Sequence, residues 1–148
     1  MEHFSITPFH PDDQAAVKQL ILAGLVEHWG FLDPTKNPDL ENITVSYAGT
    51  TFLVARLGSD IVGTGALVAH QAGTAEIVRM SVAQQHRRSG IGQRILDALI
   101  AQARAQGFHQ VILETTATWQ EVIEFYLRCG FRITHYLDGD VYFLLELL

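Results

Sequence analysis

The sequence predicts an α/β fold: a mixed, twisted sheet with antiparallel flanks and helices on both of its faces. Three observations predict it. Segments in which apolar residues alternate, as in strands, are interspersed with segments of helical periodicity. Short turns join neighbouring strand segments at both ends of the sheet, which indicates antiparallel hairpins. In the middle of the chain, helical segments separate consecutive strand segments, which indicates crossover connections.

The N-terminal third is predicted to form one strand and two helices. His3–Pro8 is the strand, and Pro11 fits the first turn of a helix that Gly30 ends. The apolar residues of that helix are Val17, Leu20, Ile21 and Leu25. A second, short helix is expected after Asn37. Its buried stripe is Leu40, Ile43 and Tyr47.

The rest of the chain is predicted to be strands with two further helices. The strands are Thr51–Leu57, Ile61–Ala69, Ala75–Val82, Val111–Thr115, Phe131–Leu137 and Val141–Leu148. Apolar residues recur at helical spacing from Ile91 to Gly107 and from Trp119 to Gly130, and a glycine ends each helix. Asp138-Gly139 is a strong hairpin signal. The element order is therefore β-α-α-β-β-β-α-β-α-β-β.

Length and composition bound the class of protein. The 148 residues fit a single domain, 1–148, and 48% hydrophobic residues are enough for a core. A net charge of −6 argues against general nucleic-acid binding, which needs a basic face. Cys129, the single cysteine, cannot form an internal disulfide. With no signal peptide pattern and no membrane-spanning run, we expect a cytoplasmic protein with no membrane partner.

The most informative segment is the glycine loop Gln85–Gly92, which lies between a strand and a helix. Gly90 and Gly92 at a helix N-terminus permit close backbone approach and leave N–H groups unpaired. Arg87 and Arg88 add positive charge, so the loop is suited to a phosphate or pyrophosphate. The nucleotide-triphosphatase loop is excluded, because no Lys-Ser or Lys-Thr follows its last glycine. The dinucleotide fingerprint is excluded as well, because Ile95 stands where it needs a third small residue.

A second motif follows in the next helix, where Tyr126 precedes Gly130-Phe131. Together with Arg87-Arg88-Ser89-Gly90-Ile91-Gly92, it makes the sequence resemble the GNAT superfamily of acyl-CoA N-acyltransferases. The motifs span residues 75–131, and the element order matches that fold over the whole chain.

The resemblance implies that acetyl-CoA is the cosubstrate and lies in a V between strands 75–82 and 111–115. The backbone of the first strand would pair with the pantetheine amides through Met80, Ser81 and Val82. The pyrophosphate would be held by Arg87, Arg88, Ser89, Gly90, Ile91 and Gly92. The Val82 N–H would polarise the thioester carbonyl, and Tyr126 would protonate the departing thiolate.

Two glutamates are candidates for the general base. Glu76 aligns with a position that supplies the base in some members of this family, and strict alternation puts it on one strand face with Val78 and Met80. A solvated carboxylate at a strand end is the alternative interpretation. Glu114 is the second candidate, although an ion pair with Arg79 on the neighbouring strand is the favoured explanation for it.

The resemblance also concerns the acceptor side. The segment between the first two helices lines the acceptor pocket in such proteins, and its aromatic and acidic residues suit a cationic amine. These residues are Glu27, His28, Trp29 and Phe31. Trp119 departs from the pattern, because many members have an asparagine there that bonds the pantetheine arm; Thr118 or aromatic packing would replace that contact. The seven histidines show no metal-ligand spacing, so we expect no metal.

These inferences converge on an N-acetyltransferase that moves acetyl from acetyl-CoA directly to a primary amine, either a small cationic amine or an amine of a protein or peptide. A non-catalytic acyl-CoA-binding sensor or subunit is the alternative. A nucleotide transferase would need clustered carboxylates for magnesium near the loop, which the sequence lacks there. The last strand is apolar on both faces, so helices of this chain or a second subunit must cover it, and we expect a homodimer.

Overall fold

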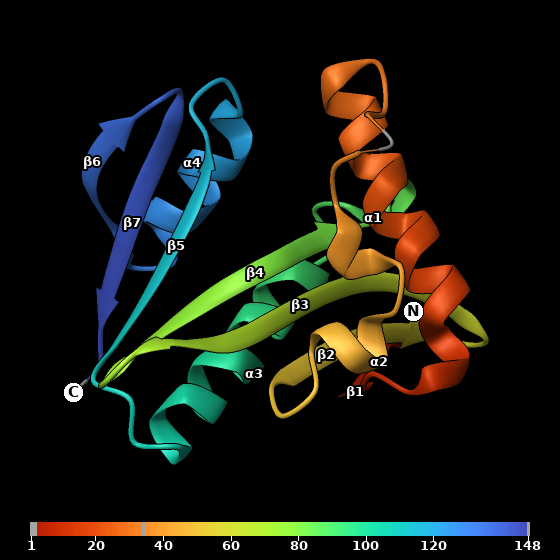
Figure 1. Ribbon diagram of the computed structural model, residues 1–148, viewed down its shortest axis with the longest axis horizontal. Coiled ribbons are helices and arrows are strands. Elements are labelled where there is room, and N and C mark those ends of the chain that lie inside the picture. The colour runs from red at the N-terminus through yellow and green to blue at the C-terminus, as the bar shows by residue number, and fades with distance from the viewer. Residues whose placement is uncertain (1–2, 34, 148) are drawn as a thin grey trace.

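A computed structural model describes residues 3–33 and 35–147, and its centre is one seven-stranded sheet. The strands are β1 (Ser5–Pro8), β2 (Thr51–Leu57), β3 (Asp60–Gln71), β4 (Thr74–Val82), β5 (Gln110–Thr116), β6 (Arg132–Leu137) and β7 (Asp140–Glu146). The helices are α1 (Gln14–Trp29), α2 (Ile43–Ser46), α3 (Ile91–Ala105) and α4 (Gln120–Arg128). The strand order is β1-β2-β3-β4-β5-β7-β6, and within the described ranges only β4 and β5 pair in parallel (Figure 1). The predicted α/β class and the mixed sheet are confirmed.

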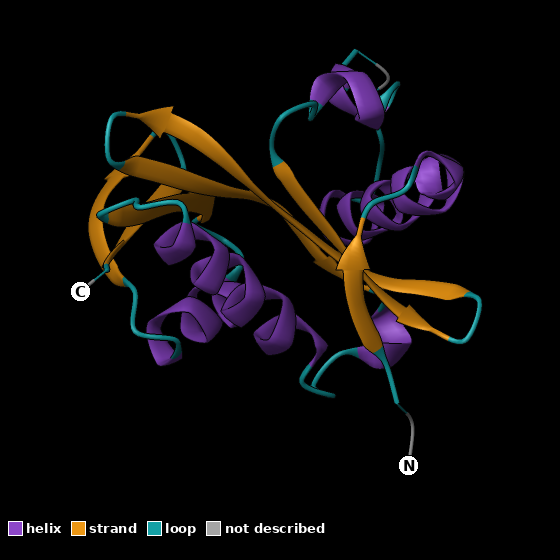
Figure 2. Ribbon diagram, turned by 90° about the horizontal axis from the view of Figure 1, so that it is seen from below, coloured by secondary structure: helices purple, strands orange, loops and turns teal. Residues whose placement is uncertain are grey.

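Helices cover both faces of the sheet, as predicted (Figure 2). On one face, here called the α1 face, α1 and α2 pack on β2, β3 and β4 around Val17, Leu40, Ile43, Val54 and Ala66, all fully buried. On the other, the α3 face, α3 and α4 bury a larger cluster that includes Ile95, Leu99, Val111 and Phe143. Among the described residues, no helix is both long and apolar enough to cross a membrane.

Most predicted elements are present with bounds shifted by one to three residues, and the second helix differs in kind. The helix expected after Asn37 is a 3₁₀ turn, Pro38–Leu40, followed by the single turn of α2, because Asn42 is extended and caps α2 through the Val45 N–H. Leu40 and Ile43 are buried as expected, whereas Tyr47, the third residue of the predicted stripe, is only partly buried. The last strand ends at Glu146, and the predicted end at Leu148 lies outside the described residues.

Candidate active site

The sheet splits between β4 and β5. Their parallel pairing covers only Thr74–Glu76 against Gln110–Ile112, and beyond these residues the two strands diverge into a V (Figure 1). The split starts just before a β-bulge in β4. Ala66 of β3 is opposite Val78 and Thr64 is opposite Ser81, so Arg79 and Met80 together face the single residue Gly65. Arg79 has a φ of 57°, in the left-handed region, which L residues with side chains rarely adopt.

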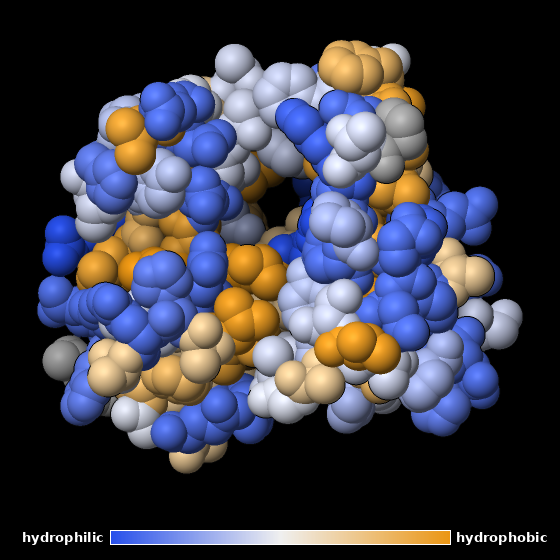
Figure 3. All heavy atoms as spheres, in the orientation of Figure 1, coloured by the Kyte–Doolittle hydropathy of each residue, from blue (hydrophilic) through white to orange (hydrophobic). Residues whose placement is uncertain are grey.

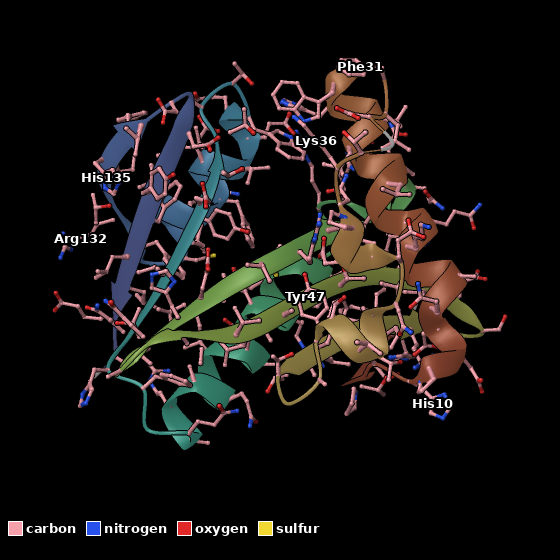
Figure 4. All side chains as sticks on the ribbon, viewed as in Figure 1. His10, Phe31, Lys36, Tyr47, Arg132 and His135 are labelled. Carbon is pink, nitrogen blue, oxygen red and sulfur yellow. The ribbon has the colours of Figure 1, made fainter. Side chains whose placement is uncertain are left out.

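The bulge is held by an ion pair on the α1 face. Arg79 donates from Nη2 to Asp39 Oδ1 at 2.6 Å and from Nε to Oδ2 at 3.0 Å, and it also reaches Asn37 Oδ1 at 3.1 Å. The Tyr47 hydroxyl donates to Asp39 Oδ2 at 2.5 Å, and Figure 4 shows Tyr47 over the strands of this face. Burial by itself would raise the pKa of Asp39, but the hydrogen bonds from Arg79 and Tyr47 outweigh it and lower that pKa. The same burial raises the pKa of Tyr47 to about 12.

The ion pair predicted between Glu114 and Arg79 is therefore wrong. The two strands have already separated at these residues, and Arg79 instead forms its ion pair with Asp39, which lies on the segment before α2. Glu114 lies opposite Tyr142 of β7 and accepts a hydrogen bond from its hydroxyl, which raises the pKa of Tyr142.

The bulge also corrects the predicted alternation along β4. Glu76 and Val78 point to the α1 face, but the extra residue turns Met80 to the α3 face, where its sulfur lies against Gly65 and the side chains of α3. A Cβ on Gly65 would lie 2.6 Å from Met80 Sδ and 2.7 Å from Ile95 Cγ2. Met80 and Glu76 therefore lie on opposite faces of the sheet. Glu76 is where β4 still pairs with β5, and Met80 is where the two strands have separated.

The glycine loop lies at the open end of the V. A 3₁₀ turn, Gln84–His86, leads into it, and both Arg88 and Gly90 have left-handed backbones, with φ of 64° and 89°. Ser89 turns its hydroxyl back onto the His86 carbonyl. Helix α3 then starts at Ile91, and the N–H groups of its first turn have no acceptor within the helix. The loop thus presents backbone donors and two guanidinium groups at one helix end, as an anion site requires.

A cavity of about 850 Å³ runs from this loop into the V. Most residues expected to hold the cosubstrate line it: Met80, Ser81, Val82, Arg87, Arg88, Gly90, Ile91, Gly92 and Tyr126. Ser89 lies outside the lining. The β5 wall is made by Leu113, Glu114, Thr115 and Thr116, and α4 adds Val122 and Phe125.

Tyr126 approaches the cavity from the α3 face. It is 5% exposed and packs its ring against Phe125, Phe131 and Phe143. This burial raises the pKa of the phenol, so Tyr126 stays protonated at neutral pH and keeps a proton that it can donate. Tyr126 is therefore both a core aromatic residue and part of the cavity wall.

The two glutamates lie on the α1 face where the strands begin to part. Burial raises the pKa of Glu76; the nearby His70 lowers it and the charge of Glu114 raises it further. Glu76 Oε1 is 3.7 Å from His70 Nδ1. Glu114 lines the cavity, whereas Glu76 is next to the lining and not part of it. The carboxylates and Tyr126 thus lie on opposite sides of the opening between β4 and β5.

The sequence matches the family described as the acetyltransferase (GNAT) family over residues 16–131. The chain belongs to this family. It is 34% identical to rat N-acetyltransferase 8F1 over 103 residues, 65% of this chain and 47% of that protein. It is 35% identical to the IAA acetyltransferase of Azospirillum brasilense over 120 residues, 80% of this chain and 78% of that one. The chain thus spans about half the length of the rat relative.

Solved structures of other GNAT-fold proteins superpose over nearly the whole chain. A GNAT acetyltransferase from Staphylococcus aureus aligns with a TM-score of 0.90 at 24% identity, covering 99% of this chain and all of that one. The PaiA N-acetyltransferase of Thermoplasma acidophilum, solved in complex with coenzyme A, aligns with a TM-score of 0.86 at 16% identity, covering 98% and 99%. These likenesses establish the GNAT fold.

In this GNAT chain none of the four residues expected in the acceptor pocket lies on the wall of this cavity. Glu27 makes an ion pair with Arg87 of the glycine loop. His28 stacks on Trp119, and Trp29 packs edge-on against His28 while remaining 49% exposed. Phe31 is 67% exposed and lies at the far end of α1 from His10 (Figure 4).

Sequence reasoning missed two features of this site. Asp39 and Asn37 hold the bulge, but nothing in their local sequence indicates a partner about 40 residues away. Asp140 lines the cavity from the start of β7, because β7 inserts between β5 and β6. The Asp138-Gly139 turn signal predicts the hairpin, but the insertion beside β5 depends on the whole sheet.

Proposed function

We propose that this chain is an N-acetyltransferase that moves acetyl from acetyl-CoA directly to a primary amine. The observation that carries the proposal is the opening between β4 and β5, which has an anion site and Tyr126 on one face and two carboxylates on the other. One face can thus receive an anionic thioester and the other a cationic amine, and the two meet within the sheet. The coenzyme A complex of a protein with this fold supports the choice of donor.

Backbone groups and positively charged side chains bind acetyl-CoA, the acetyl donor. The first-turn N–H groups of α3, with Arg87 and Arg88, hold the pyrophosphate. Beyond Glu76, the β4 edge facing β5 has lost its strand partner, so the backbone groups of Met80–Val82 are available to the pantetheine amides as to an added strand. The Val82 N–H then donates to the thioester carbonyl oxygen as negative charge develops there.

The reaction is a direct acyl transfer. Glu76 takes one proton from the ammonium group through a water, while Glu114, on the cavity wall, attracts the positive charge. The free amine attacks the thioester carbonyl carbon and forms the new C–N bond. The C–S bond then breaks, and Tyr126 donates its proton to the departing thiolate. The second amine proton leaves to water, and water reprotonates Tyr126.

The test is calorimetric titration with acetyl-CoA and desulpho-coenzyme A, followed by thiol release over a panel of amines. We expect both ligands to bind and a few amines to release coenzyme A. Tyr126→Phe should keep the binding and lose most of the release. Binding with no release from any small or peptide amine would favour the acyl-CoA sensor, and absence of binding by both ligands would overturn the assignment.

A further inference from the structure

The open end of the V is closed by the last turn of α1. Helices α1 and α4 lie on opposite sides of the V (Figure 1), and contacts of Glu27 and His28 at the C-terminal end of α1 reach both of its walls. Glu27 makes an ion pair with Arg87, whose Nε in turn donates to the Val82 carbonyl at 3.1 Å, at the end of β4. One wall of the V is therefore tied to α1 by a chain of two polar contacts.

The next residue of α1 reaches the other wall. The His28 ring stacks on the indole of Trp119 with 4.3 Å between centroids and 16° between planes. His28 Nε2 is also 3.3 Å from the hydroxyl of Thr118, in the same loop between β5 and α4. Trp119 lines the cavity, so the indole is both part of the cavity wall and the far end of the bridge.

These contacts turn the V into a closed ring. β4 and β5 join at its base through Thr74–Glu76, and the α1 turn joins them at its open end. Figure 3 shows the result as a dark hollow between the two halves of the molecule, with side chains on every side of it. An acceptor that comes from the α1 face must pass through this window to reach a thioester on the α3 face.

Given the proposed function, on which this inference rests, the geometry points to the His28–Trp119 stack as the contact that determines acceptor specificity. A closed window admits an amine on an unbranched CH2 group, such as a linear alkylamine or a lysine side chain. It excludes amines on branched carbons, which carry substituents beside the nitrogen, and the α-amine of most peptides is of this kind. Glu114 on the cavity wall favours the cationic form of the amine that enters.

The test uses two non-reactive analogues, coenzyme A alkylated on sulfur with N-butylacetamide or with N-tert-butylacetamide, titrated by calorimetry. The wild type should bind the linear analogue at least about tenfold more tightly than the branched one. His28→Ala and Trp119→Ala should bring the two affinities within about twofold of each other by opening the window. Trp119→Phe retains a ring and should keep most of the selectivity, and it guards against a variant that fails to fold.

His3→Ala is the matched control, because His3 is exposed and does not line the cavity, and it should leave the ratio at the wild-type value. Equal affinities in the wild type, or an unchanged ratio in both His28→Ala and Trp119→Ala, would overturn the window while leaving acetyl transfer intact. If coenzyme A itself fails to bind, the proposed function fails, and the window with it. Calorimetry with unmodified coenzyme A therefore separates the two failures.

Discussion

The first and second halves of β4 are built differently. From Thr74 to Ile77 the strand begins with hydrogen bonds on both edges, to β3 and β5, and Ala75 and Ile77 are buried. From Val78 to Val82 it bonds to β3 alone, and its other edge faces the cavity. The second half contains the bulged residue Arg79, whose guanidinium forms an ion pair with Asp39. A single strand can therefore serve as core in one half and as a binding edge in the other.

The largest expected effect comes from removing the ion pair between Asp39 and Arg79 at the bulge. Asp39→Ala leaves the Arg79 charge half-buried without its carboxylate, and should lower the free energy of unfolding by about 3 kcal/mol in urea titrations. Because the folded pKa of Asp39 is below 3.8, its contribution is complete above that pH and is lost as the pH falls through the folded pKa. The gap between wild type and variant should therefore narrow on acidification below about pH 4.

The matched control is Asp12→Ala, whose carboxylate is 91% exposed beside His10. Its urea midpoint should be that of the wild type. A loss as large as that of Asp39→Ala would mean that the bulge has no special dependence on its ion pair.

The next prediction concerns Glu76, the last residue of β4 that pairs with β5. Glu76→Gln should lower kcat roughly a hundredfold, because the amine loses its base, with little change in the KM for acetyl-CoA. Glu114→Gln should instead raise the KM for the amine. In the wild type, kcat/KM should rise with pH through the pKa of Glu76, which is above 4.5.

The pH dependence of the contribution of Glu76 to stability should be opposite to that of kcat/KM. Since folding raises the pKa of Glu76, the folded state disfavours its charge: the contribution to stability is present at low pH and lost as pH rises through the folded pKa. Glu76→Gln should therefore be more stable than the wild type at pH 7, measured by thermal melting. A less stable variant with unchanged kcat would assign Glu76 a structural role only.

A smaller effect is expected at Gly65, the residue opposite the bulge. Gly65→Ala would put a Cβ 2.6 Å from Met80 Sδ and should lower the free energy of unfolding by about 1–3 kcal/mol. Gly24→Ala is the control, because its Cβ would meet only Ser81 Oγ at 3.4 Å, within helix α1. That variant should be more stable by up to about 1 kcal/mol. Equal changes at both positions would contradict the tight packing behind the bulge.

The smallest effect is expected between the glycine loop and α4. Arg88 Nη2 is 3.7 Å from Glu121 Oε1, and both side chains are more than 80% exposed. Glu121→Gln should leave the melting temperature unchanged and free Arg88 for the pyrophosphate, tightening coenzyme A binding by roughly two- to threefold at low salt. Calorimetry at low and high salt checks this, and a gain that persists at high salt would argue against an electrostatic cause.

The local patterns predicted most of the fold. Alternation and turn residues located the strands, and β2 has the predicted bounds, Thr51–Leu57. The glycine loop and Tyr126 were also predicted from short motifs, and both line the cavity. These features depend on backbone conformation and apolar spacing within a few residues, which a single sequence displays directly.

Periodicity failed where one residue changed the pattern. Alternation placed Glu76 and Met80 on the same face, but the bulge at Arg79 puts them on opposite faces. No turn-forming residue in the sequence indicates the bulge, because an arginine rather than a glycine occupies the left-handed position. Its stabilisation comes from Asp39 and Tyr47, which are distant in sequence.

The sequence by itself determined the secondary structure, the position of the glycine loop and the tyrosine of the second motif, because each depends on neighbouring residues and their spacing. Only the tertiary structure decided which carboxylate pairs with Arg79, which glutamate reaches the cavity, and that His28 and Trp119 close the V. These contacts join residues tens of positions apart. They are fixed by where the sheet splits and how helix α1 crosses it, and no local pattern records that geometry.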